Sequence, residues 1–470
     1  MNKQVLGVKQ KALQINLDKK TYGSFAEIGA GQEVAAHFFK AGAASMTVAK
    51  TMSAYDMTFS DAIYGAEESG RYVVESRLLK MLAKEYSLLE IRLNEKRGAD
   101  THFFSYANTL TTISYDKTRL GHGWMGVRFQ LHPLSEPNEC IIHFNLLDND
   151  AILQQHAVGV LGVNLIFACL YRHENPEDLI LTLMEELAND RVEIDMFRIE
   201  GPDFKHIDNR LTSLLLVKHK FTPAALFNPE GQVLQASDFF YKKDIIAYRG
   251  RFRPFTLVNK DMYEKGIDQF EAEEHVDKDN LVKVAELTLH NLQSASESKE
   301  INLKDFLDRA DLLCSQGYTV LVSDYQGYYR LAGYFSTFTK RHIGIILGMF
   351  NLVDIFNEDF YKKLPGGILG AFSSLFAPNV KLYVYPIKRK DGTFWNCHNF
   401  EAPANLKYLY QHLIENNKIE DISNYDESIL DITSDNVYKM ISEGQPNWEH
   451  LVPEEVAKVI KSQKLFGYKE

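Results

Sequence analysis

The residues between Ala26 and Ala35 have the types and spacing of an anion-binding turn. A short apolar run is interrupted by Gly29 and Gly31, and the helical spacing that follows predicts a strand, a tight turn and a helix beginning near Gln32. In such a turn the backbone N–H groups and the positive end of the helix dipole face an anion, so phosphate, pyrophosphate or a carboxylate is the natural ligand. Gly29 and Gly31 are therefore candidate cofactor-binding residues.

This segment departs from a complete dinucleotide-binding fingerprint. The fingerprint needs a third glycine three residues after the second, and Val34 occupies that position. The segment also resembles the first motif of nucleoside-binding methyltransferases, except that Glu33 stands where a further glycine is usual. Turn chemistry without a ligand is the alternative. If the turn binds a ligand, its amides face a cavity, and a β-branched residue in place of Gly31 should harm ligand binding more than folding.

A basic segment between residues 241 and 260 offers a second set of anion ligands. It contains a single acid, Asp244, and six basic residues. These are Lys242, Lys243, Arg249, Arg251, Arg253 and Lys260. If residues 249–253 are extended, the three arginines lie on one face, which suits bidentate contacts to phosphate or carboxylate. The alternatives are a subunit interface or ion pairs within the chain, for which the acids of residues 261–279 are closest in sequence.

The basic segment should be neutralised by something other than solvent, because neighbouring like charges repel one another. If the arginines converge on the glycine turn, they neutralise an anionic ligand there. Lys50 is a further candidate counter-ion for a ligand at that turn. If the arginines instead contact acidic side chains of the same or a neighbouring chain, that contact would favour the self-assembly hypothesis.

Other patterns that could support chemistry are less specific. Glu193 and Asp195 share one face of a predicted strand about 6.6 Å apart, a spacing compatible with a metal site or an acid–base pair, and a solvated strand face is the alternative. His122, His132 and His143 are interpreted as structural residues, so no metal site is predicted. The sequence contains no HExxH, GxSxG, GxxxxGK[ST] or CxxC motif. It therefore assigns neither catalytic residues nor a reaction, and it leaves open whether the protein is an enzyme.

Composition narrows the class of protein. The 470 residues carry a net charge of −11, which argues against general nucleic-acid binding through phosphate neutralisation. The four cysteines are scattered, which fits neither a disulfide scaffold nor a zinc module. The longest apolar run, residues 157–171, is shorter than the roughly 18 residues of a membrane span and predicts a buried helix. Residues 1–17 lack the features of a secretory signal, so we expect a reduced, cytoplasmic protein without a membrane segment.

Strand and helix patterns alternate and predict an α/β or α+β fold with mixed sheets and packed helices. Strands are expected near residues 46–49, 124–132, 140–147, 191–199, 318–323 and 381–387, and helices near 69–97, 151–171, 176–189, 303–315 and 403–416. Between residues 325 and 338 aromatic residues crowd together, and either a base-stacking pocket or a core cluster would explain them. The predicted domains are an N-terminal α/β domain over 1–260, an acidic helical connector over 261–300 and a C-terminal α/β domain over 301–470.

Seven segments carry a resemblance that covers nearly the whole chain. They are residues 22–35 (YGSFAEIGAGQEVA), 49–57 (AKTMSAYDM), 60–65 (SDAIYG), 162–166 (GVNLI), 193–196 (EIDM), 208–211 (DNRL) and 465–468 (LFGY). In these segments the sequence resembles a family of uncharacterised bacterial proteins. Members of that family carry names such as nicotinate-nucleotide adenylyltransferase and TonB-dependent receptor.

Neither of those names agrees with the residues of this chain. Such adenylyltransferases hold phosphates with an HxGH signature, and the nearest approximation here, residues 121–123 (GHG), lacks the second histidine. A TonB-dependent receptor is an outer-membrane barrel with a signal sequence and many amphipathic strands of about ten residues, whereas this sequence is rich in predicted helices. The resemblance therefore implies a bacterial cytosolic protein and leaves the reaction open.

Two hypotheses from different classes follow. The first is a homo-oligomeric protein that binds a nucleotide or another phosphorylated metabolite, with Gly29 and Gly31 under the ligand and Lys50 or an arginine of residues 249–253 as counter-ion. The second is a self-assembling structural or scaffold protein, in which the arginines, the acidic segment and the aromatic cluster form subunit contacts. The two are compatible, and the glycine turn favours the first.

Overall fold

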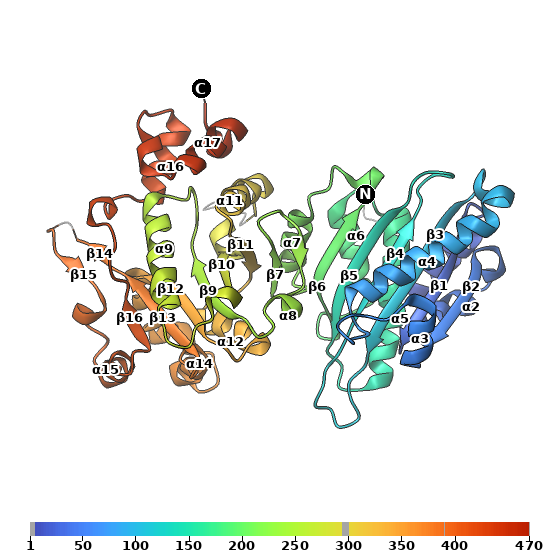
Figure 1. The fold of residues 1–470 in the computed structure, drawn as a ribbon, viewed down its shortest axis with the longest axis horizontal. Coiled ribbons are helices and arrows are strands. Elements are labelled where there is room, and N and C mark those ends of the chain that lie inside the picture. The colour runs from blue at the N-terminus through green and yellow to red at the C-terminus, as the bar shows by residue number, and fades with distance from the viewer. Residues whose placement is uncertain (1–4, 294–299, 390, 470) are drawn as a thin grey trace. The chain divides into compact units, whose positions relative to one another are not determined.

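A computed structural model describes residues 5–293, 300–389 and 391–469 (Figure 1). The chain forms two compact units, residues 1–222 and 223–470. Each unit contains a mixed sheet with packed helices, which confirms the predicted fold class. The unit boundary at 222 differs from the predicted boundaries at 260 and 300. Residues 244–249 and 281–288, which flank the acidic segment, are neighbouring parallel strands of the second sheet, and a sheet cannot be divided between its own strands.

The sheet of the first unit has six strands. They are β1 (Thr21–Gly29), β2 (Val48–Ala54), β3 (His102–Thr111), β4 (Gly121–Phe129), β5 (Asn138–Leu146) and β6 (Val192–Glu200). Their order is β2-β1-β3-β4-β5-β6. β1 is parallel to β2 and β3, whereas the pairs from β3 to β6 are antiparallel. Because side chains alternate between the two faces of a strand, this register decides which distant residues share a face.

Helices cover both faces of this sheet. They are α1 (Val8–Leu17), α2 (Glu33–Ala41), α3 (Met57–Tyr64), α4 (Glu75–Leu93), α5 (Ala151–Tyr171), α6 (Pro176–Leu183) and α7 (Asn209–Lys218). α1, α2 and α5 contact one another and enclose a core that contains Phe25, Phe38 and Val158. α4 lies on the opposite face, where the Ser105 hydroxyl donates a hydrogen bond of 3.0 Å to the carbonyl of Leu82.

The apolar helix predicted at 151–171 is α5. Asp150 caps it by accepting hydrogen bonds from the N–H groups of Ile152 and Leu153. Among the described residues it is the one helix long and apolar enough to cross a membrane, yet 78% of that apolar stretch is buried inside the folded chain. This burial supports the predicted core helix. The cysteines are free, and the thiol of Cys140 contacts that of Cys169 in the same core.

The sheet of the second unit has eight strands. They are β7 (Ala224–Phe227), β8 (Val233–Leu234), β9 (Asp244–Arg249), β10 (Leu281–Thr288), β11 (Thr319–Ser323), β12 (Ile343–Gly348), β13 (Val380–Tyr385) and β16 (Ile419–Asp421). Their order is β16-β13-β12-β9-β10-β11-β7-β8. The six strands from β16 to β11 are parallel, and β7 pairs antiparallel with β11. The chain passes from β9 to β10 and β11 and then returns to β12 on the other side of β9.

The described part of this unit also contains ten α-helices and a two-stranded ribbon. They are α8 (Ala236–Phe239), α9 (Leu257–Glu271), α10 (Leu289–Leu292), α11 (Leu303–Ser315), α12 (Tyr328–Phe338), α13 (Met349–Ile355), α14 (Gly367–Leu375), α15 (Lys407–Glu415), α16 (Ser434–Glu443), α17 (Glu454–Gln463), β14 (Ile387–Lys388) and β15 (Phe394–Trp395). α11 confirms the helix predicted at 303–315. The aromatic residues of α12 join the core, where Phe335 is buried with its ring centre 5.2 Å from that of Phe240.

Candidate functional site

The glycine turn joins β1 to α2 as predicted, with Gln32 at the N-cap of the helix. Gly29 has φ of +86°, a conformation that favours glycine. A Cβ atom at Gly29 would collide with the carbonyl oxygen of Leu110, and one at Gly31 would collide with the amide of Asn108. Both glycines are therefore required by close packing of the turn against β3. Neither of the two described pockets is lined by residues of this turn.

Two buried polar side chains lie under the glycine turn. Glu27 is 2% exposed and accepts a hydrogen bond of 3.3 Å from the N–H of Ala35 in α2. Burial, together with the charge of Glu33, raises the pKa of Glu27 to about 7. Asn108, which is opposite Glu27 in the register of β1 and β3, donates to the carbonyl of Gly31 at 3.4 Å. Within the described residues the Asn108 Oδ1 atom has no hydrogen-bond partner.

Lys50 lies away from these groups. It is on β2, in register with Ser24, so its side chain is on the face of the sheet opposite to that of Glu27. Its ammonium pairs at 2.5 Å with the carboxylate of Glu85 in α4, which also accepts a hydrogen bond of 2.9 Å from Tyr64. The charge of Lys50 is thus balanced by Glu85.

The three arginines lie at the carboxyl end of β9. Arg249 is the last residue of the strand, and its guanidinium makes a bidentate contact with the buried carboxylate of Glu286 at 2.7 and 3.0 Å. The Ser323 hydroxyl donates to the same carboxylate at 2.5 Å, and the Tyr328 ring stacks under the guanidinium with a centroid distance of 4.4 Å. Arg249 therefore joins the ends of β9, β10 and β11.

Arg251 and Arg253 follow in the turn between β9 and α9, residues 250–256, which we call the arginine turn. Arg251 is 68% exposed and its guanidinium lies 3.8 Å from the carboxylate of Asp435. Arg253 is 41% exposed, pairs with Asp305 at 2.8 Å and donates to the hydroxyl of Tyr438 at 2.9 Å. These partners belong to α11 and α16, not to the acidic segment predicted as the nearest source of charge. The charge of the arginine turn is thus partly neutralised by side chains of its own unit.

The arginine turn is not extended. Phe252, between the two arginines, is buried and has φ of +49°, which is rare for a bulky residue. The condition under which the three arginines would share one face is therefore not met. Arg309 of α11 fixes the turn, because its buried guanidinium donates to the carbonyls of Arg251 at 3.0 Å and Asn291 at 2.8 Å. Such enforced backbone strain is frequent at ligand-binding sites.

The position of this turn in the sheet is informative. It leaves the first of six parallel strands and leads into the N-terminus of α9, which Thr256 caps by accepting from the N–H of Asn259. The strand order reverses between β9 and β12. In open α/β sheets ligands bind outside the carboxyl ends of the strands at such a reversal.

A polar chain runs across β4, β5 and β6 in the first unit. His122 Nδ1 lies 3.2 Å from His143 Nε2, and His143 Nδ1 lies 2.5 Å from Asp195 Oδ1. Asn145 donates to the second oxygen of Asp195 at 3.2 Å. Burial, together with the charge of Asp195, raises the pKa of Glu193 to about 6. We call these five residues the His122–Asp195 chain.

Sequence spacing indicated only part of this chain, because it placed Glu193 and Asp195 on one strand face as a possible metal site or acid–base pair without connecting them to the histidines. His122 and His143 were interpreted as separate structural histidines, but the antiparallel register of β4 and β5 places them on the same face. A bulge in β6 then inserts Asp195 opposite the step from His143 to Phe144. Bulges re-aim side chains in this way, and single-sequence patterns do not locate them.

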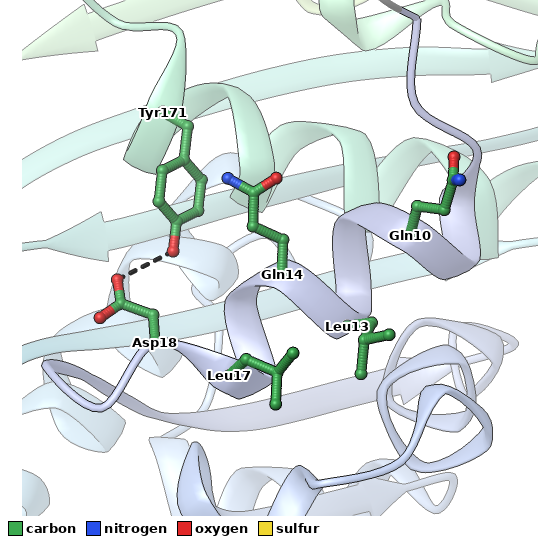
Figure 2. A pocket seen from close by; sticks show the side chains of 6 residues that line it. All are labelled: Gln10, Leu13, Gln14, Leu17, Asp18 and Tyr171. Atoms are coloured by element: carbon green, nitrogen blue, oxygen red, sulfur yellow. Dashed lines mark hydrogen bonds between the residues drawn. The ribbon is translucent and has the colours of Figure 1, made fainter.

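The two described pockets offer little for an anionic ligand. The first, about 490 Å³, lies between α1 and the end of α5, and in it Tyr171 donates to Asp18 at 2.9 Å (Figure 2). Its other lining residues are Gln10, Leu13, Gln14 and Leu17. The second, about 190 Å³, lies at the amino ends of β12 and β13. There the ammonium of Lys381 pairs with Glu273 and Glu420, so its charge is balanced.

No protein-family model matches the sequence, and no curated protein matches it. Solved structures similar to part of the chain include the competence/damage-inducible protein CihA from Agrobacterium tumefaciens, at 16% identity over 35% of this chain and 97% of that chain, with a TM-score of 0.25. A competence-damaged protein (CinA) superfamily protein from Enterobacter cloacae matches at 13% identity over 37% of this chain and 96% of that chain, with a TM-score of 0.26. A likeness of this size concerns fold alone and carries no argument about function.

Proposed function

We propose that this protein binds a nucleotide or another phosphorylated metabolite at the arginine turn of its second unit. The observation that carries the proposal is the placement of Arg251 and Arg253 on the turn after β9, beside the reversal of strand order. Guanidinium groups make bidentate contacts to phosphate, and the N-terminus of α9 adds a favourable dipole. The glycine turn of the first unit, where the sequence placed the ligand, remains a candidate that is less accessible because it packs against β3.

The contacts at the turn leave room for a ligand to compete. The pair between Arg251 and Asp435 is long, and both side chains are mostly exposed. An exposed pair of this kind contributes about 0–1 kcal/mol, so a phosphate with two or more charges can displace the carboxylate. Arg249, by contrast, is buried in an ion pair with Glu286. We therefore assign it a structural role in holding the turn and not a role in binding the ligand.

The turn lacks the glycine-rich sequence of dinucleotide-binding proteins. Its one glycine is Gly250, and a single glycine does not provide the spacing that lets backbone amides approach a pyrophosphate. The recognition in this proposal therefore depends on arginine side chains. It extends to any small phosphorylated metabolite that two guanidinium groups can hold.

Isothermal titration calorimetry with ADP and with inorganic pyrophosphate tests the proposal. We expect binding that weakens at high salt and that falls at least about 30-fold in the double variant R251A/R253A, because each charge-assisted hydrogen bond contributes about 1.5–3 kcal/mol. R330A, which removes an exposed arginine of α12, should bind like the wild type. Equal affinities for the wild type and the double variant, or no binding of either ligand at millimolar concentration, would overturn the proposal.

Self-association is a second candidate property. Four large apolar side chains of the second unit are mostly exposed, and side chains of this kind bind a partner where they gather into one contiguous patch. They are Phe350, Phe360, Leu369 and Tyr408. Such a patch would support the homo-oligomer of the first hypothesis and equally the scaffold hypothesis, in which assembly is the whole function.

A further inference from the structure

We propose that the outer edge of β2 in the first unit is an interface between two copies of this chain, which pair antiparallel through residues 50–54. β2 is the terminal strand of the six-stranded sheet, with β1 as its one neighbour among the described strands (Figure 1). This contact is separate from the arginine turn, which belongs to the other unit, and from the exposed apolar side chains of the second unit. It therefore does not rest on the proposed ligand site.

The backbone of β2 has hydrogen-bonding groups left over along this edge. Alternate residues of a strand aim their N–H and C=O groups at opposite edges, so about half of those of β2 point away from β1. Within the described residues, no backbone hydrogen bond joins residues 48–54 to any segment besides β1. An unpaired edge of this kind is a template for a further strand.

The middle of β2 is exposed on both faces of the sheet. Lys50 and Thr51 are adjacent, so their side chains lie on opposite faces, and both residues are exposed. Natural edge strands avoid pairing through prolines, unpaired inward charges or a very short length. β2 has seven residues and no proline, and the charge of Lys50 is already paired with Glu85. The strand thus lacks the usual protection against pairing.

The second half of β2 is complementary to itself in an antiparallel pair centred on Met52. The register between β1 and β2 shifts once, before Lys50, so the residues that follow form a regular strand. A two-fold axis at Met52 places Thr51 of one copy opposite Ser53 of the other, and symmetry makes this contact twice. Opposed residues with hydroxyl groups stabilise a strand pair. A second copy therefore fits the edge residue by residue.

Charge does not oppose this pairing. In the register centred on Met52, Lys50 faces Ala54 of the other copy, so no like charges lie directly opposite each other. The two Lys50 positions are about 13 Å apart, because four residues of a strand span that length. This separation exceeds the Debye length of about 8 Å at physiological ionic strength. Glu85 also balances each Lys50 within its own copy.

Apolar side chains at both ends of β2 add area to the contact. Met46 precedes the strand, and Tyr55, Met57 and Phe59 follow it, and all four are exposed. In an antiparallel pair the end of one strand lies beside the start of the other, so Met46 of one copy comes near the apolar residues that follow β2 in its partner. Aromatic side chains bury about 150–250 Å² each. The flanking residues thus bring the contact toward the roughly 800 Å² per partner that a stable interface buries.

Disulfide cross-linking of the full chain tests the register. Cys314, which is partly buried, is first replaced by serine, and the other three native cysteines are buried. A mixture of T51C and S53C proteins should form intermolecular disulfides at least about fivefold faster than either protein alone, because directly opposed Cβ atoms are closer than diagonal ones. E174C, at an exposed position of the same unit, is the control and should link no faster than T51C alone.

Charge variants at the same two positions test the strength of the contact. T51K/S53K places lysine opposite lysine twice, whereas T51K/S53E places lysine opposite glutamate twice. Sedimentation velocity in the F360A/L369A background, which removes contacts of the second unit, should give a Kd at least about tenfold higher for the first variant than for the second. Both positions are exposed, and thermal unfolding checks that the two variants fold equally well.

Hydrogen exchange on the unmodified chain decides the matter even where a variant folds poorly. Pairing should slow the exchange of residues 48–54 at high protein concentration relative to low concentration, because association protects the outward N–H groups. The proposal is overturned by any of three results. One is a T51C and S53C mixture that links no faster than either protein alone. Another is an equal Kd for the two charge variants. The third is exchange of β2 that does not depend on protein concentration.

Discussion

Glu27 shows how a single residue links the glycine turn to the stability of the first unit. Its carboxyl group is buried under α2, and its pKa rises from 4.5 to about 7, first through burial and then through the charge of Glu33. The folded state therefore binds the proton more tightly than the unfolded state does. Stability from this group is complete below about pH 4.5 and is lost as the pH rises toward 7.

Replacement of Glu27 by glutamine should remove this loss. The rise from 4.5 to about 7 corresponds to about 3 kcal/mol, so E27Q should be more stable than the wild type above pH 7, with a difference that shrinks as the pH falls toward 4.5. Urea unfolding of both proteins between pH 5 and 8.5 measures the difference. E174Q, at an exposed position, is the control. A stability difference for E27Q that does not change with pH would contradict this account of Glu27.

Gly31 provides a second test at the scale of a residue. The sequence led us to expect that a side chain at Gly31 would harm ligand binding more than folding, but the structure shows a Cβ at this position in collision with the buried amide of Asn108. We expect G31A to cost about 1–3 kcal/mol of stability, as overpacking does, and N108A to relieve most of that cost. G333A, where a Cβ meets open space, should cost nothing. An additive G31A/N108A pair in the double-mutant cycle would show that the collision is not the cause.

At the scale of elements, α16 lies against the arginine turn through Asp435 and Tyr438. D435N removes the carboxylate that faces Arg251 and should raise affinity for pyrophosphate about two- to fivefold, because the exposed pair is worth at most about 1 kcal/mol. Calorimetry and thermal unfolding of the same samples separate affinity from stability. E443Q on the same helix, which removes the partner of Lys439, should leave affinity unchanged. If D435N weakens binding, Asp435 supports the site instead of competing for it.

Elements with strong local signals could be predicted from the sequence. The glycine turn, α5 and α11 follow from spacing, capping residues and stop signals that lie within the segment itself. The arginine turn was recognised by its charge, but its conformation depends on Arg309, which is more than fifty residues away. The His122–Asp195 chain depends on strand register and a bulge. Such contacts are set by tertiary pairing, so no local pattern reports them.

At the scale of the whole molecule, the sequence predicted mixed sheets with packed helices but not the division of the chain. The predicted domains ended the first unit after the basic segment, at 260, and assigned the acidic segment to a connector over 261–300. In the structure, strands β9 and β10 flank the acidic segment and lie side by side in one sheet. Burial of their apolar side chains, and not the charge of the neighbouring residues, therefore decides that both strands belong to the second unit. The reversal of strand order beside the arginine turn likewise could not be predicted, because it depends on how distant strands pair in the sheet.

Self-association is tested on the intact chain of 53.8 kDa. We expect sedimentation equilibrium to give a multiple of this mass, because exposed apolar side chains in the second unit gain by burial between copies. F360A/L369A should shift the equilibrium toward the monomer, whereas F39A, an exposed apolar change in the first unit, should not. A monomer at all accessible concentrations would remove both the oligomer and the scaffold hypothesis.

The central claim is that a phosphorylated ligand binds at the arginine turn, and a difference density map from crystals soaked with ADP tests it most directly. The account predicts a diphosphate within hydrogen-bond distance of the guanidinium groups of Arg251 and Arg253, with Asp435 displaced from Arg251. Saturating ADP that leaves the turn without density, or that binds elsewhere on the chain, would contradict it.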